Sequence, residues 1–304
     1  MRGYKGFHKG MICRGKQYTE NAVFEEPEAN ICEKGMHFCT NPFDVLDYYD
    51  FVDDNGELNE FAEVEPLDEA ETDDYRKYCT KKLKIGAKLS LAEFIQVCAR
   101  KAESLDSSKD FAKICRSAND IQVGVTGFGS KVVSTGHFSR VAVTENESNI
   151  VVTGDRSDVG VTGDCPLIMV TGRYSQVAST GRHSKVTATN NSSMVISMGN
   201  FSSVITEGMN SRVVVTGNYS TVTSTGSKSK VASMGESCII CCTGRGSRAK
   251  AKKGSWITLA EWKYDEQRKK YIPAYMKTEQ VDGERIKEDV FYVLKDGEFQ
   301  EVEA

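Results

Sequence analysis

The chain has 304 residues, and its 43 acidic and 39 basic side chains leave a formal charge of −4. This length allows two or three domains with cores of their own. No run approaches the roughly 18 apolar residues of a membrane helix, and the first residues lack the apolar segment of a secretory signal. We therefore expect a cytoplasmic protein without membrane association, and ten cysteines that are reduced thiols rather than a disulfide framework.

Residues 1–90 are expected to form an α+β head. A helical pattern starts at Asn41, which can serve as N-cap, with Pro42 at the first position. Strand-like runs follow at Glu60–Val64 and Lys81–Ile85.

Residues 91–120 are predicted to be a helical linker that caps the next domain. Ser90 and Glu93 have the spacing of a capping box. Apolar residues then recur on one stripe of a helix at Leu91, Phe94, Ile95 and Cys98. After a polar link, we expect a second short helix near Phe111–Cys115 that covers the open edge of the repeat domain.

Residues 121–255 consist of a nine-residue repeat, Thr-Gly-x-x-Ser-x-Val-x-x, without insertions. Counting from Gly127 to Gly244, twelve of fourteen repeat-start positions are Gly, and Glu145 and Asn190 are the exceptions. Ser follows three residues later in twelve repeats and Val or Ile five residues later in thirteen. Positions three, five and seven after the glycine share one face of a short strand, and the glycine is expected to supply the turn conformation. One repeat cannot bury this face alone, so the strands must stack into a β-solenoid.

Two repeats per coil give 18 residues per coil and about seven coils in the simplest closure, and residues 18 apart then become vertical neighbours. This pairing predicts an aromatic ladder of His183, Phe201 and Tyr219. A basic ladder of Arg212, Lys230 and Arg248 is predicted on a sheet face. Both ladders are candidate binding surfaces, although the favoured interpretation is that the aromatics only cover a thin core and the cations keep the rod soluble.

Residues 256–304 lose the repeat and are predicted to form a small antiparallel β cap. Trp256–Trp262 alternates as a strand, and Asp282-Gly283 and Asp296-Gly297 have the composition of hairpin turns. The fold class is therefore mainly β: a nonapeptide β-solenoid between an α+β head and a β cap.

The head contains a dense acidic run. Fourteen Asp and Glu occur between Asp44 and Asp74 without a single Lys or Arg, whereas residues 116–253 carry fifteen basic and eight acidic side chains. Such a run is either an ordinary solvated surface or a mimic of nucleic-acid phosphates that occupies a cationic groove of another protein. The candidate binding residues are Asp44, Asp47, Asp50, Asp53, Asp54, Glu57 and Glu60.

The cysteines admit a second chemistry. Cys13, Cys32, His37 and Cys39 could supply a zinc site, although buried or unpaired thiols are the favoured interpretation and no metal is expected. Cys238 and Cys242 occupy inward repeat positions. No cofactor is expected unless the head is an enzyme.

Several segments resemble an uncharacterised family that is common in bacteriophages and prophages. The matching segments are Gly3–Phe7, Cys13–Gly15, Cys32–Cys39, Asn41–Tyr49, the Thr-Gly-x-x-Ser repeats, Ala260–Trp262 and Leu294–Phe299. The resemblance spans nearly the whole chain and implies a phage-related origin within a bacterial cell, without an activity.

The head is also faintly similar to ADP-ribosyltransferases in the order of Arg14, His37, Tyr48 and Tyr49. That resemblance implies NAD as cofactor and these four residues as the catalytic site. It also requires a late catalytic Glu, which the strand near 80–86 does not offer, while Glu63 and Glu65 come too early.

Three functional hypotheses remain. The first is a non-enzymatic interaction protein whose acidic head, held on a rigid solenoid, binds a host bacterial protein with a cationic nucleic-acid-binding groove, as an inhibitor of a bacterial defence system would. The second is an ADP-ribosyltransferase-like enzyme. The third is a structural virion or surface protein that forms homo-oligomers through its solenoid faces.

Overall fold

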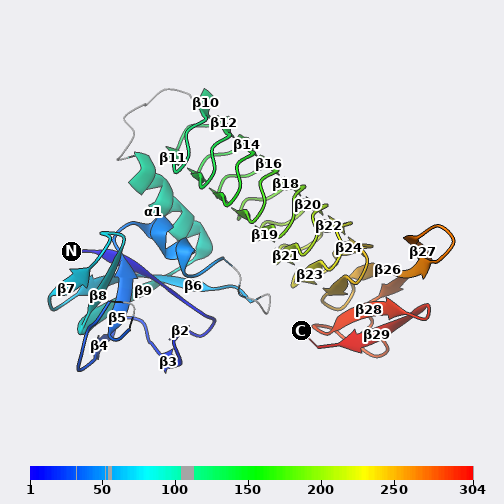
Figure 1. Ribbon diagram of the computed structural model, residues 1–304, viewed down its shortest axis with the longest axis horizontal. Coiled ribbons are helices and arrows are strands. Elements are labelled where there is room, and N and C mark those ends of the chain that lie inside the picture. Colours follow the sequence, from blue (N-terminus) through cyan, green and yellow to red (C-terminus); the bar gives the residue numbers. More distant parts are fainter. Residues whose placement is uncertain (32, 52, 54–56, 104–112, 304) are drawn as a thin grey trace. The chain divides into compact units, whose positions relative to one another are not determined.

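A computed structural model describes residues 1–31, 33–51, 53, 57–103 and 113–303, with the backbone alone at 102–103 and 113–115. Its contacts divide the chain into two compact units, Met1–Ser108 and Lys109–Ala304. The predicted mainly β fold with a central solenoid is confirmed. Figure 1 shows the elements of each unit in the order of the chain.

The first unit is built on a seven-stranded sheet with the order β4-β9-β6-β1-β5-β8-β7, in which the paired strands are antiparallel. Phe7, Ala62 and Leu83 belong to the core on one face of this sheet. On the other face, the ring of Phe61 stacks on Phe94 at a centroid distance of 4.0 Å. The strands and helices of this unit are β1 (Gly3–Phe7), β2 (Ile12–Cys13), β3 (Lys16–Gln17), β4 (Val23–Glu25), β5 (Met36–Cys39), η1 (Pro42–Asp47), β6 (Glu60–Pro66), β7 (Ala70–Thr72), β8 (Lys77–Thr80), β9 (Lys82–Leu89) and α1 (Leu91–Glu103).

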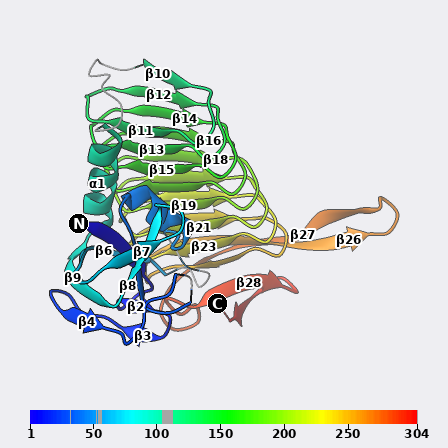
Figure 2. The same cartoon turned by 60° about the vertical axis from the view of Figure 1, so that its left-hand side comes forward.

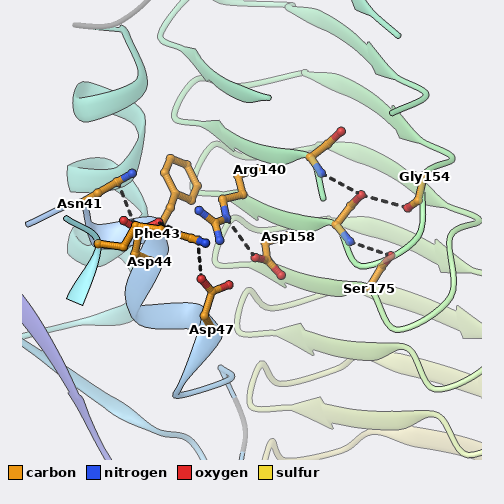
Figure 3. Close-up of polar contacts among 11 residues, drawn as sticks. Asn41, Phe43, Asp44, Asp47, Arg140, Gly154, Asp158 and Ser175 are labelled. Carbon is orange, nitrogen blue, oxygen red and sulfur yellow. Dashed lines mark hydrogen bonds and ion pairs between the residues drawn. The ribbon is translucent and has the colours of Figure 1, made fainter. Parts of the chain in front are cut away.

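Both predicted helix starts in this unit are confirmed. The side chain of Asn41 accepts a hydrogen bond from the Phe43 amide at 3.2 Å, although the helix that it caps, η1, is a single 3-10 segment (Figure 3). Ser90 and Glu93 form the predicted capping box, in which the Glu93 carboxylate accepts from the Ser90 amide at 2.7 Å. These bonds also hold the pKa of the Glu93 carboxyl below its usual value.

The predicted linker at 91–120 requires correction. Helix α1 contacts η1, β6 and β9 and therefore belongs to the first unit, because its apolar stripe buries Phe94 and Ile95 against the head. The predicted helix at 111–115 is also wrong where the chain is described: Lys113–Arg116 is strand β10, the first strand of the solenoid. Residues 111 and 112 lie outside the described part.

The solenoid consists of two parallel sheets, whose strands alternate along the chain (Figure 2). From β10 to β23, each strand pairs in parallel with the strand 18 residues later, as Val132 does with Ile150. One sheet contains β10 (Lys113–Arg116), β12 (Lys131–Ser134), β14 (Asn149–Val152), β16 (Leu167–Val170), β18 (Lys185–Ala188), β20 (Ser203–Thr206), β22 (Thr221–Ser224), β24 (Ile239–Cys242) and the start of β26 (Trp256–Asp265). The other contains β11 (Gln122–Val125), β13 (Arg140–Val143), β15 (Asp158–Val161), β17 (Gln176–Ser179), β19 (Met194–Ser197), β21 (Arg212–Val215), β23 (Lys230–Ser233) and β25 (Arg248–Lys250).

The two-repeat coil is confirmed, but the number of coils is about eight rather than seven. The strands before Gly127, β10 and β11, lack the repeat glycine, so the sequence pattern does not include them. Ala118 stands where the glycine would be in the first coil.

The repeat glycines are required for close approach rather than for a turn conformation. At Gly136, Gly181 and Gly226, a Cβ atom would lie inside the carbonyl oxygen of the residue 18 positions earlier. The left-handed backbone instead occurs two residues after the glycine position, as at Phe201 (φ 58°). The expectation that the glycine itself, or Asn190 in its place, adopts this conformation is therefore wrong: neither has a positive φ.

In several turns the repeat serine forms two hydrogen bonds. The Ser157 hydroxyl donates to the carbonyl of Gly154 at 2.9 Å, and the Ser157 amide donates to the hydroxyl of Ser175, one coil later, at 3.2 Å (Figure 3). Because this pattern repeats along the rod, polar turn atoms that would otherwise be buried without partners are satisfied.

The interior of the solenoid is narrow, and its polarity changes along the rod. The fifth position holds fully buried Val or Ile throughout most coils, such as Ile150 and Val195. At the seventh position, Val152 and Val170 of the earlier coils give way to Thr206 and Ser224 in the same column. In the described part of the chain, the buried hydroxyl oxygens that have no hydrogen-bond partner are those of Ser197, Thr206, Ser224 and Ser233.

Replacing Thr206 by valine is therefore expected to stabilise the protein by about 1 kcal/mol, because it removes a buried unpaired hydroxyl and keeps the side-chain shape. Urea unfolding followed by circular dichroism measures the effect. Ser179→Ala is the control. It is expected to lower the stability, since the Ser179 hydroxyl forms a hydrogen bond with that of Ser184 at 2.7 Å. An unchanged or lower stability of Thr206→Val would contradict the prediction.

The C-terminal cap consists of two hairpins that extend the two solenoid sheets. β26 pairs with β24 and then with β27 (Lys270–Gln280), while β28 (Phe291–Lys295) joins β25 to β29 (Glu298–Val302). The predicted turn at Asp296-Gly297 is confirmed, and both residues have positive φ. Asp282-Gly283 is not a hairpin turn, because it connects strands of different sheets; the Asp282 carboxylate instead accepts two backbone amides of the loop.

Candidate functional site

The head contains a cavity of about 410 Å³ where its sheet separates. β1 pairs with β6 over five residues but with β5 only at Tyr4 and Cys39, so the two strands diverge beyond this pair. The cavity is lined by Tyr4, Lys5, Gly6, Cys13, Arg14, Lys16, Tyr18, Glu26, Pro27, Glu28, Glu33, Lys34, Gly35, His37, Phe38, Cys39, Val45, Tyr48, Tyr49 and Lys77. All four residues of the predicted transferase site, which are up to 35 positions apart, thus line one cavity.

Arg14 is placed by a tight hairpin. β2 and β3 are joined by Arg14-Gly15, and both residues have left-handed φ values, 50° and 76°. This is the conformation of a type I′ turn, which favours Asn or Gly at the position that Arg14 occupies. The guanidinium donates to the carbonyl of Glu33 at 3.4 Å, so it bridges the hairpin to the opposite wall of the cavity. A non-glycine residue in this conformation costs about 1 kcal/mol.

His37 is a neutral imidazole at neutral pH. Burial, followed by the nearby charges of Arg14, Lys5 and Lys77, lowers its pKa to about 4. At pH 7 it can therefore donate and accept hydrogen bonds but adds no positive charge. At Gly35, two residues earlier, a Cβ atom would come within 2.8 Å of Ala29 and Cys79, so only glycine allows this close packing beside the His37 strand.

The two tyrosines line different parts of the cavity. The ring of Tyr49 lies over Gly6, where a side-chain Cβ would come within 2.6 Å of it, and its hydroxyl donates to the Cys13 sulfur at 3.0 Å. Burial raises the pKa of Tyr49, so its hydroxyl remains protonated. Tyr48 is about half exposed, and the Lys77 ammonium lies 4.9 Å from its ring centroid. The arrangement offers aromatic faces for a planar ring and cations for an anionic group.

Several residues that line the cavity do not follow from the sequence patterns. Lys5 and Lys77 add positive charge or amine chemistry, and three carboxylates come from the segment 26–33. Glu26 forms an ion pair with Lys16, and Glu28 with Lys34. Neither Glu63 nor Glu65 is among the lining residues. Side chains alternate along β1, so Lys5 lies on the same face of the strand as the core residue Phe7. A lysine at a position that faces the core was the sequence feature that could have identified Lys5 as a site residue.

The acidic candidates are largely engaged within the head. Arg76 contacts Asp44 at 3.1 Å and Asp47 at 2.5 Å, and Lys9 contacts Glu57 at 2.6 Å. Glu60 pairs with Lys88 at 3.1 Å and accepts from the Met11 amide at 2.7 Å. The Asp53 carboxylate caps the Glu57 amide, Asp50 accepts from Asn59 through its carbonyl, and Asp54 lies outside the described residues. These contacts give the carboxylates structural roles and reduce the free negative charge that a phosphate mimic would need.

The predicted aromatic ladder exists. The rings of His183, Phe201 and Tyr219 stack with centroid distances of 5.2 and 5.3 Å and interplanar angles of 10° and 12°. Phe201 therefore has both ring faces covered by its neighbours, although half of its surface is exposed. The ladder presents ring edges rather than faces, so the stacking stabilises successive turns and is poorly suited to stack on a base or sugar.

The predicted basic ladder is confirmed as a set of paired neighbours: Arg212 aligns with Lys230, and Lys230 with Arg248. Two of these cations approach the Phe291 ring of the cap, Lys230 at 5.1 Å and Arg248 at 5.7 Å from the centroid. Arg248 also donates to the carbonyl of Glu303 at 3.0 Å. Part of this ladder therefore anchors the C-terminal cap.

Other candidate groups are placed as follows. Cys238 and Cys242 are buried as predicted, and burial raises the pKa of the Cys242 thiol to about 12. Cys32 lies outside the described residues, and among those that are described no group of three or more His, Cys, Asp or Glu is positioned to hold a metal ion. The outer face of the β12–β26 sheet exposes the apolar side chains of Leu167, Met169, Ile205, Ile239 and Trp256.

Comparison with known proteins identifies only the head. Residues 1–97 match the model of a domain of unknown function (DUF7666). No curated protein matches the chain, and no solved structure matches it. In the described part of the chain, no helix is both long enough and apolar enough to span a membrane.

Proposed function

We propose that the head binds a ring-bearing anion of the nicotinamide-dinucleotide class. The observation that carries the proposal is the convergence of Arg14, His37, Tyr48 and Tyr49 on one cavity. The volume of about 410 Å³ lies in the range of small-molecule sites. A cavity with aromatic walls and cations of this kind suits a ligand that has both a planar ring and a phosphate group.

The cavity carries several cations. Lys16 and Lys34 form ion pairs with Glu26 and Glu28 of the same cavity. Arg14 donates to the carbonyl of Glu33 at 3.4 Å, and the Lys77 ammonium lies 4.9 Å from the ring centroid of Tyr48. The five donors of a guanidinium form a fork that matches the oxygens of a phosphate, so Arg14 is the group that we expect to bind the anionic part of the ligand.

Titration calorimetry with NAD, ADP-ribose and adenosine tests this proposal. Arg14→Gln is expected to weaken the binding of NAD and ADP-ribose at least about tenfold, because a charge-assisted hydrogen bond contributes about 1.5–3 kcal/mol. Binding of uncharged adenosine should change little. Arg182→Gln, in an exposed turn of the solenoid, is the matched control and should leave all affinities unchanged.

Two results would overturn the proposal: no binding of either anion at millimolar concentration, or equal affinities for Arg14→Gln and the unaltered protein. Release of nicotinamide from NAD, measured in the same samples, adds a test of chemistry. Release that is lost in Arg14→Gln supports cleavage of the bond between nicotinamide and ribose at this site, whereas tight binding without release supports a receptor and argues against the transferase.

The phage origin, the host-protein partner, a role against bacterial defence and oligomerisation through the solenoid faces stay predictions. The ion pairs of Asp44, Asp47, Glu57 and Glu60 weaken the charge argument for a phosphate mimic. The exposed apolar residues of the β12–β26 sheet fit lateral association but identify no partner.

A further inference from the structure

Lys5 is a buried amine on the wall of the head cavity. Its residue surface is 5% exposed, and its Nζ donates to the carbonyl of His37 at 2.8 Å. The rings of Phe7 and Tyr18 lie 5.5 Å from the nitrogen. Among the described residues, no carboxylate forms an ion pair with Lys5, whereas Lys16 and Lys34 on the same cavity each have one.

This environment disfavours the ammonium form. A buried lysine that lacks a counter-ion loses the hydration of its charge, and the cavity cation Arg14 adds repulsion. Burial accordingly lowers the pKa of Lys5, and the neighbouring Cys13 and Cys39 only partly oppose this effect. A deprotonated lysine amine is a nucleophile towards carbonyl compounds.

We propose that Lys5 is a covalent capture site for an aldehyde or ketone that carries an anionic group. The amine adds to the carbonyl carbon to form a carbinolamine. Loss of water, which takes the carbonyl oxygen and both amine hydrogens, then gives the imine without any change of oxidation state. The departing oxygen and these two hydrogens leave together as water, so the step balances without a further reactant. The anionic group of the ligand would be bound by Arg14 or Lys77, so the inference rests on the cavity being the ligand site proposed above.

Reductive trapping on the full chain tests this proposal. The protein is incubated at pH 7 with pyridoxal 5′-phosphate, a planar aldehyde with a phosphate, then treated with borohydride and mapped by peptide mass spectrometry. Labelling of Lys5 is expected to be at least about tenfold faster than that of Lys131 and Lys185, because an ordinary lysine with a pKa near 10.4 is almost wholly protonated at this pH. Both comparison lysines are exposed on solenoid strands. The labelling rate of Lys5 should also level off at a lower pH than theirs.

The proposal would be wrong if the Lys5 peptide remained unlabelled or were labelled no faster than the comparison lysines. This outcome can be read from the unaltered protein alone. In Lys5→Met, which keeps an apolar stem in the buried position, the fast label should disappear while a thermal scan checks that the head stays folded. Calorimetry separates the two proposals. Lys5 trapping without binding of NAD or ADP-ribose leaves the capture site standing alone, and anion binding without trapping removes only the capture site.

Discussion

Gly226→Ala is expected to lower the free energy of unfolding by about 3 kcal/mol, because the added methyl group must displace backbone rather than a side chain. A Cβ at Gly226 would lie inside the carbonyl oxygen of Gly208, one coil earlier. The two coils must move apart to relieve this clash. That movement strains the backbone hydrogen bonds between them, such as the one from the Thr225 amide to the Thr206 carbonyl at 3.0 Å. Urea unfolding followed by far-ultraviolet circular dichroism measures the loss.

Two matched variants distinguish the close approach from a general effect of glycine. Gly226→Asn should cost less than Gly226→Ala, since Asn190 occupies the same column two coils earlier. There its amide donates to the Thr171 carbonyl at 2.7 Å and accepts from the Asn191 amide at 3.0 Å. Gly129→Asn should be nearly neutral, because Gly129 has a left-handed φ of 65° and open space around it. If Gly226→Ala were no worse than Gly129→Asn, the close-approach argument would be wrong.

Phe94→Ala is the second substitution with a large expected effect. Phe94 is fully buried, and its ring stacks on Phe61 of β6 with an interplanar angle of 12°. Truncating a buried aromatic side chain costs about 3–5 kcal/mol, and here the loss should detach α1 from the sheet. Hydrogen exchange read at the amides of β6 and α1 should then lose protection relative to the unaltered chain.

The control for Phe94 is Tyr75→Ala, because Tyr75 is 81% exposed in the same unit. The free energy of unfolding of this variant is expected to lie within about 0.5 kcal/mol of that of the unaltered protein. Phe94→Leu, which keeps most of the buried volume, should fall between the two. Equal stabilities of Phe94→Ala and Tyr75→Ala would show that α1 is not part of the head core.

The head was only partly predictable from the sequence. The capping box at Ser90 and the N-cap at Asn41 could be identified because their hydrogen bonds join residues two or three positions apart. The cavity brings Lys5 of β1 to the carbonyl of His37 of β5, and such pairings depend on strand order. The resemblance to transferases selected four cavity residues, but neither Lys5 nor the carboxylates of 26–33 follow from it.

The sequence by itself determined that the repeats form a β-solenoid, because one nonapeptide cannot bury its apolar face alone. It favoured an 18-residue coil as the simplest closure, and the structure decided for two repeats per coil rather than three. Three further features were decided only by the tertiary structure. The glycines are needed because coils approach closely, not because the chain turns there. The first strand, Lys113–Arg116, forms by pairing with β12 although it lacks the motif. The cavity exists because β1 and β5 separate beyond Tyr4 and Cys39, a long-range event that local patterns do not encode.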